Sequence, residues 1–129
     1  MILAINRFSL PALLLACLLI CPAVDGNFVC AGERLPLHIV LVLDGSGSMA
    51  GQPNQQLKQA AALLVRGLAM RDYPATKVGV VEFNSIARTL SQLTNNESQA
   101  IAAINKIRAN GGTAIDAGIL EGLEVLRQG

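Results

Sequence analysis

The chain has 129 residues, with 10 Lys and Arg against 9 Asp and Glu, one His and no Trp. This length leaves room for one domain. A formal net charge of +1 without a basic run argues against nucleic acid or an anionic membrane surface as a partner, and one Tyr and three Phe leave little to stack bases on.

The N-terminal segment 1–26 is typical of a secretory signal peptide. Arg7 precedes an uncharged apolar stretch over 8–24, and small residues follow, so we expect cleavage near residues 23–26. An uncleaved membrane anchor is the alternative, but this stretch contains Pro11 and a spanning helix usually needs about 20 residues. We therefore expect a secreted or otherwise extracytoplasmic protein, with no membrane contact beyond this segment.

Residues 27–36 are expected to link the signal peptide to a domain over 37–129. Signal cleavage would remove Cys17 and Cys21 and leave Cys30 as an odd cysteine. Because an oxidising compartment favours pairing of leftover thiols, Cys30 is either a harmless free thiol or half of a disulfide whose partner lies outside these residues.

Three segments have strand patterns. Residues 37–43 are a continuous apolar run ending in Asp44, which is typical of a strand buried on both faces in a parallel sheet. Residues 77–83 predict a second strand, and the weaker alternation over 87–93 predicts a short edge strand.

Three further segments have helix patterns. A loop over 45–53 precedes the first, whose apolar residues recur at helical spacing: Leu57, Ala60, Ala61, Leu64, Val65 and Leu68. Capping-box spacing over 94–97 opens the second, which ends at Gly111-Gly112. Its expected inward residues are Ile101, Ile104 and Ile107. The last helix starts near Ala114 and is expected to bury Ile115, Ile119, Leu123 and Leu126.

The order strand, helix, strand, strand, helix, helix predicts an α/β layered domain. A strand as apolar as 37–43 belongs in the centre of a sheet, yet the other expected strands can all lie to one side of it. A central strand with one unpaired edge would aggregate or pair with another chain. The sequence therefore predicts a domain that is truncated at its C-terminus.

The most informative stretch is 44–49, at the carboxyl end of the expected central strand, where open α/β sheets bind ligands. Asp44, Ser46 and Ser48 are spaced at i, i+2 and i+4 of a glycine-rich loop and can point into one concavity. These hard oxygen donors suit Mg²⁺, Mn²⁺ or Ca²⁺, whereas zinc is disfavoured because no Cys or His is nearby. A divalent cation that is bound by one carboxylate and two hydroxyls needs additional ligands.

This D-x-S-x-S pattern, followed by Gly111-Gly112-Thr113 at the head of a helix, resembles the von Willebrand factor type A (vWA) domain and its metal-ion-dependent adhesion site. The resemblance covers about 35–126. It implies a Rossmann-like fold with a mainly parallel central sheet, an antiparallel edge strand and helices on both faces. It also implies four metal ligands: Asp44, Ser46, Ser48 and Thr113. The family's second site Asp follows a fourth strand, which this sequence does not reach.

The resemblance implies a binding module and not an enzyme. Few anionic ligands leave a bound Mg²⁺, or Mn²⁺ or Ca²⁺, electrophilic, so an Asp or Glu carboxylate of a protein partner can complete its coordination shell. Family members often pair a cysteine before the first strand with one after the last helix, which makes Cys30 resemble half of such a bridge.

Other interpretations concern the same residues. Asp44 could act as the nucleophile of a metal-dependent phosphatase, although that reaction requires a second acidic residue at the position of Ser46. A dinucleotide fingerprint over 45–50 is disfavoured because the helix starts too late. The chain could also be a truncated, non-functional fragment.

The remaining polar residues have structural interpretations. The segment 111–113 could be only a helix stop and N-cap. Asp116 is expected to favour the dipole of the last helix. His38 is expected to be structural, and Glu82 to be a solvated carboxylate at a strand end.

Overall fold

The computed structural model describes residues 36–128. The expected signal peptide over 1–26, Cys30 and nearly all of the expected linker over 27–36 lie outside the described residues.

The described part contains a three-stranded sheet in the order β1-β2-β3. Strand β1 (His38–Asp44) is parallel to β2 (Lys77–Phe83), and β3 (Ala87–Thr94) is antiparallel to β2. The predicted strands and the antiparallel edge are therefore confirmed. Strand β1 was expected to be buried on both faces but is only half-buried, because it is an edge strand of the described sheet, with β2 as its one paired neighbour there.

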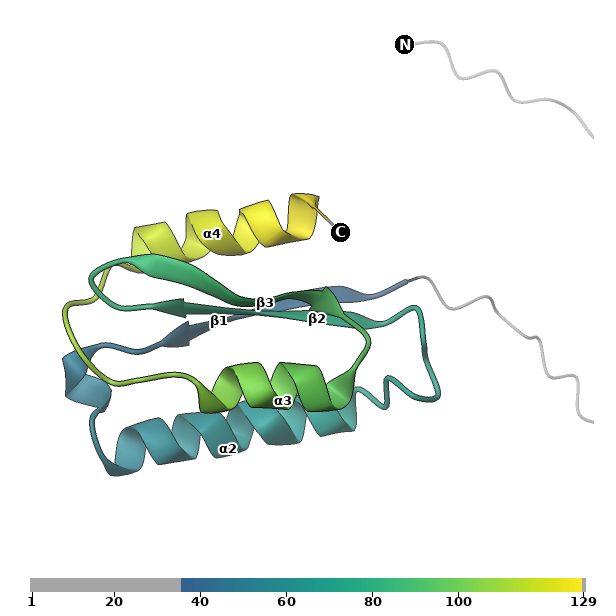
Figure 1. Cartoon of the computed structure of the whole chain (residues 1–129), viewed down its shortest axis with the longest axis horizontal. Helices are drawn as coiled ribbons and strands as arrows, with labels where there is room; N and C mark the ends of the chain where they lie inside the picture. The colour runs from purple at the N-terminus through teal and green to yellow at the C-terminus, as the bar shows by residue number, and fades with distance from the viewer. Residues whose placement is uncertain (1–35, 129) are drawn as a thin grey trace, which may run out of the picture. The chain divides into compact units, whose positions relative to one another are not determined.

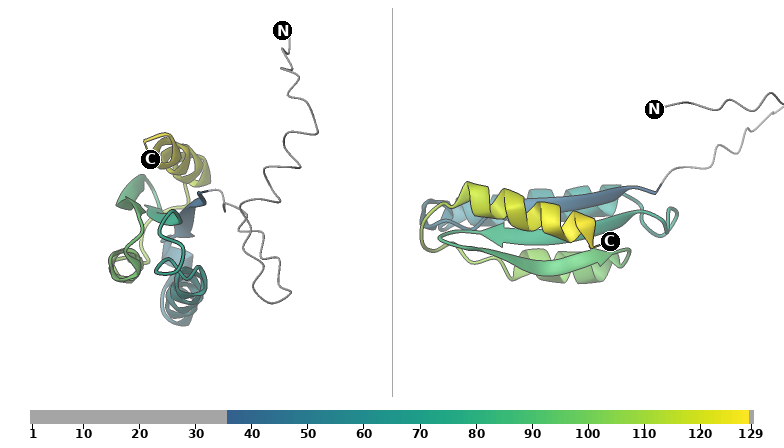
Figure 2. Two further views of the ribbon diagram at one scale, coloured as in Figure 1. Left: turned by 90° about the vertical axis from the view of Figure 1, so that its right-hand side faces the viewer. Right: turned by 90° about the horizontal axis from the view of Figure 1, so that it is seen from above.

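The helices form a layer on each face of this sheet. A 3₁₀ turn, η1 (Gly47–Met49), precedes α2 (Gln52–Gly67), and α3 (Glu97–Asn105) and α4 (Ile115–Arg127) follow the strands. Helices α2 and α3 cover one face and α4 lies along the other, as predicted (Figures 1 and 2). No helix between residues 36 and 128 is long and apolar enough to cross a membrane.

The main core fills the space between the sheet and the α2–α3 layer. Its buried members are Ala61, Val65, Met70, Val78, Val80, Ala100, Ala103, Ile104 and Ile107. Leu64, one of the apolar residues at helical spacing in α2, is 49% exposed and does not join this core. Helix α2 also starts one residue before Pro53, because Pro lacks an N–H and fits the first turn of a helix.

Helix α3 begins and ends at other residues than the sequence predicts. Strand β3 runs through Thr94, so the N-cap is Asn96, whose side chain accepts a hydrogen bond from the Gln99 N–H at 3.2 Å. The helix ends at Asn105, several residues before Gly111, so the expected stop at the glycine pair is wrong.

Helix α4 packs on the sheet with a different face from the predicted one. Gly118, Gly122 and Val125 are buried, whereas the four residues expected to face inward are between 39% and 55% exposed: Ile115, Ile119, Leu123 and Leu126. A Cβ on Gly118 would lie 2.9 Å from Cδ1 of Phe83, and one on Gly122 would lie 2.8 Å from Cγ2 of Val42. The helix axis comes close to the strands because these positions carry no side chain.

Candidate functional site

Three loops meet at the carboxyl ends of β1 and β2. They are the β1–α2 loop, the β2–β3 turn and the α3–α4 loop, which lie together at the left of Figure 1. Parallel strands end at the same edge of a sheet, and helices returning from the other edge bring their loops to it. The predicted ligand-binding edge therefore has contributions from three separate segments.

The β1–α2 loop brings Asp44, Ser46 and Ser48 together. Oδ1 of Asp44 accepts a hydrogen bond from the Ser46 N–H at 2.7 Å, which leaves Oδ2 without one among the described residues. The Ser46 and Ser48 hydroxyl oxygens are 3.0 Å apart, and Ser46 is 1% exposed. The 3₁₀ turn η1 holds Ser48 in place, since the Met49 N–H donates to the Ser46 carbonyl at 3.0 Å.

Backbone hydrogen bonds attach the α3–α4 loop to this β1–α2 loop. The Asn110 N–H donates to the Gly45 carbonyl at 2.8 Å, and the Gly47 N–H donates to the Gly111 carbonyl at 3.0 Å. Gly111 has a φ of +72°, a conformation that side-chain-bearing residues rarely adopt. The segment that leads to Thr113 therefore lies against the loop that carries both serines.

Thr113 lies between two anchors on the β2–β3 turn. The Gly112 N–H donates to Oγ of Ser85 at 2.7 Å, and the Ala114 N–H donates to the Asn84 carbonyl at 2.6 Å. Thr113 is exposed, and its hydroxyl forms no hydrogen bond with any residue between 36 and 128, the other candidate ligands included. The N-cap of α4 is Ala114, so the interpretation of Thr113 as the helix cap is wrong.

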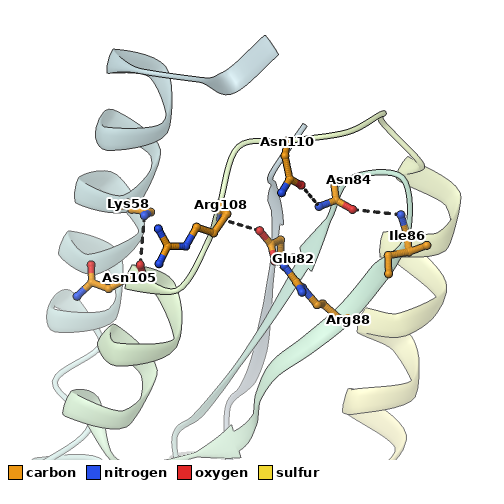
Figure 3. Close-up of polar contacts among 8 residues, drawn as sticks. All are labelled: Lys58, Glu82, Asn84, Ile86, Arg88, Asn105, Arg108 and Asn110. Carbon is orange, nitrogen blue, oxygen red and sulfur yellow. Dashed lines mark hydrogen bonds and ion pairs between the residues drawn. The ribbon is translucent and has the colours of Figure 1, made fainter. Parts of the chain in front are cut away.

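Glu82 is buried beneath these loops, with 1% exposure. Its Oε2 accepts hydrogen bonds from Nε and Nη2 of Arg88, both at 2.8 Å, and its Oε1 accepts one from the Arg108 N–H at 2.8 Å (Figure 3). The expectation of a solvated carboxylate is therefore wrong. Sequence reasoning missed its role, although Arg88 stands opposite Glu82 in the register of two predicted strands.

Asn84 and Asn110 add a side-chain link between two of the loops. Nδ2 of Asn84 donates to Oδ1 of Asn110 at 2.8 Å, while Oδ1 of Asn84 accepts from the Ile86 N–H at 3.2 Å (Figure 3). Asn84 is buried and also pairs with Ile86 through the backbone. One amide side chain thus closes the β2–β3 turn and attaches it to the α3–α4 loop.

The sequence pattern of the von Willebrand factor type A domain family matches residues 39–129 of this chain. The chain belongs to this family. An uncharacterized Synechocystis sp. protein is 39% identical to it over 99 residues, covering 75% of the chain and 23% of the relative. Inter alpha-trypsin inhibitor heavy chain 4 of Mus musculus is 33% identical over 112 residues, which are 79% of the chain and 12% of the relative.

Solved structures of other proteins have the same fold as the described part of this chain. The vWF domain of the type V pili tip protein Mfa5 from Porphyromonas gingivalis superposes with a TM-score of 0.70 at 17% identity, over 76% of this chain and 35% of that one. This likeness confirms the predicted Rossmann-like vWA fold. The chain spans less than a quarter of the length of the two curated relatives.

Asp116 and His38, the other two titratable residues considered from the sequence, lie at the start of α4 and of β1. Asp116 occupies the first turn of α4, as predicted, and His38 begins β1 at the opposite edge of the sheet. No group of three or more His, Cys, Asp or Glu side chains that could hold a metal comes together within residues 36–128.

Proposed function

We propose that this vWA domain is a secreted or otherwise extracytoplasmic binding module that holds a divalent cation at the loop cluster. The ion is Mg²⁺, with Mn²⁺ and Ca²⁺ as alternatives, and its ligands are Asp44, Ser46, Ser48 and Thr113. The observation that carries the proposal is the pair of serine hydroxyls 3.0 Å apart, in the loop that begins at Asp44.

The donor set fits a small, hard cation. Neighbouring ligands of an octahedral Mg²⁺ with bonds of about 2.1 Å lie about 3.0 Å apart, which matches the separation of the Ser46 and Ser48 hydroxyl oxygens. Oδ2 of Asp44 and the Thr113 hydroxyl remain available, since neither has a hydrogen-bond partner among residues 36–128. The ion, when bound, supplies a positive charge that attracts an external carboxylate.

A protein partner follows from the charge of the donor set. One carboxylate and three hydroxyls leave a divalent ion with a net positive charge, so an Asp or Glu side chain of a partner can bind to it. The resemblance of segment 1–26 to a secretory signal peptide supports an extracytoplasmic location.

The first test is a calorimetric titration of Mg²⁺ and Mn²⁺ into the protein and into Thr113→Val. We expect binding to the wild type and at least about tenfold weaker binding to the variant, because Val keeps the shape of Thr without its oxygen. Thr94→Val is the matched control, since Thr94 lies at the other end of β3 from the loops. Equal affinities in all three proteins would remove Thr113 from the site.

A second test separates the binding module from the phosphatase alternative. We expect no hydrolysis of a phosphate monoester with Mg²⁺ present, because that chemistry needs a second acidic residue two positions after Asp44, where this chain has Ser46. The measurement is phosphate release by the wild type and by Asp44→Asn. Turnover that disappears in the variant would favour the enzyme.

A further inference from the structure

The buried carboxylate of Glu82 joins three parts of the fold at a point just below the loop cluster. It belongs to β2, its Oε2 is bound by Arg88 of β3, and its Oε1 is bound by the backbone N–H of Arg108 in the α3–α4 loop (Figure 3). An ionised carboxylate is costly to bury unless it is paired and hydrogen-bonded. Arg88 meets the first requirement, and the Arg108 N–H helps to meet the second.

The β1–α2 loop is shaped to accept this carboxylate. A Cβ on Gly45 would lie 2.7 Å from Oε1 of Glu82 and 3.2 Å from the Arg108 carbonyl oxygen. Gly45 therefore lets the backbone after Asp44 pass directly over the Glu82–Arg108 hydrogen bond. The residue that follows Asp44 therefore lies against the same carboxylate oxygen that binds the start of the α3–α4 loop.

The Arg108 hydrogen bond is the first in a series that runs along the α3–α4 loop. Asn110 is bound next, by the Gly45 carbonyl and by the Asn84 side chain, and Gly111 then accepts from the Gly47 N–H. A shift of the backbone at Arg108 would act directly on the contacts of Asn110 and Gly111, because these residues follow Arg108 within three positions.

We propose that Glu82 is a positioning residue for the cation site. Its Oε1 holds the α3–α4 loop, and with it Thr113, against the β1–α2 loop that carries Asp44, Ser46 and Ser48. Arg88 compensates the charge of the buried carboxylate and does not itself hold the loop. The cation part of this inference rests on the proposed function, whereas the loop-holding part does not.

Two substitutions at one position separate the hydrogen bond from the charge. Glu82→Gln keeps an oxygen that accepts from the Arg108 N–H, and the half-exposed Arg88 can turn to solvent. Glu82→Leu has a similar volume, suits a buried position and accepts no hydrogen bond. Arg88→Gln is the control that removes the charge partner and leaves the Glu82 oxygens in place.

The direct readout is amide hydrogen exchange at Asn110 and Gly47, taken relative to the core amide of Val80 so that global destabilisation cancels. We expect about tenfold faster relative exchange in Glu82→Leu and nearly unchanged relative exchange in Glu82→Gln and Arg88→Gln. Mn²⁺ affinity should fall about 10- to 100-fold in Glu82→Leu alone, as for other groups that orient metal ligands.

Unchanged relative exchange in a folded Glu82→Leu would overturn the inference, and so would equal loss of protection in Glu82→Gln. If Glu82→Leu does not fold, a backbone ester in place of the Arg108 amide removes the same hydrogen bond and decides the question. A wild type that binds no Mn²⁺ would refute the proposed function, while the exchange measurement would still test the role of Glu82.

Discussion

Asp44→Ala should abolish binding of Mg²⁺ and Mn²⁺ to this vWA domain. Asp44 supplies the only formal negative charge in the proposed ligand set, and hydroxyl oxygens alone bind a divalent cation weakly. Groups that merely orient ligands change metal affinity about 10- to 100-fold, so loss of the charged ligand should exceed about 100-fold. Isothermal titration calorimetry on the wild type and the variant measures the difference directly.

Alanine also removes the hydrogen bond from the Ser46 N–H to Oδ1 of Asp44, so a second variant is needed. Asp44→Asn keeps an oxygen that can accept this bond and removes only the charge, and it should still bind no cation. Asp116→Asn is the matched control, because this exposed carboxylate lies at the start of α4, three residues after Thr113. Unchanged affinity in both Asp44 variants would eliminate the proposed site.

The sheet could be predicted from the sequence because its strands are defined by local patterns. An apolar run ending at Asp44 and a Val-rich segment ending at Phe83 are short, and both form strands at those residues. The helix ends were harder to predict. Asn96 caps α3 because β3 extends through Thr94, and the length of β3 depends on its pairing with β2.

The candidate ligands of the proposed site could be predicted from the sequence more easily than the residues that support their loops. Asp44, Ser46 and Ser48 are adjacent in the chain, so spacing alone indicates that they share a loop, and the structure has them in contact. Glu82 and Arg108 are 26 positions apart and meet through a backbone N–H, which leaves no trace in residue type. Supporting contacts of this kind depend on how the loops fold over the sheet.

Hydrophobic periodicity predicts the wrong face of α4, because it places the large apolar residues on the buried side. Two glycines, Gly118 and Gly122, mark it instead, and their positions relative to Phe83 and Val42 become visible only in three dimensions. Hydrophobic periodicity weighs a residue by its side chain, so it gives glycine no weight even where the lack of a side chain allows close packing.

Gly118→Val should therefore strongly destabilise the domain. A Cβ at this position would lie within 3.0 Å of three Phe83 side-chain atoms, and the branched side chain of Val would extend further toward β2. Overpacking of this kind costs about 2–3 kcal/mol, because the helix or the aromatic ring has to move. For a domain of this size the midpoint of thermal unfolding should fall by roughly 10 °C or more.

Gly67→Val provides the matched control for this substitution. Gly67 is also helical, at the end of α2, but nothing lies within 4 Å of the position that its Cβ would occupy. Its free energy of unfolding should change by less than about 0.5 kcal/mol, since the new side chain points to solvent. Circular dichroism melts of the two variants compare the same chemical change at both sites. Equal stability of Gly118→Val and Gly67→Val would contradict the close approach of α4 to β2, because a helix held away from the strand by its leucine and isoleucine side chains would have room for the valine.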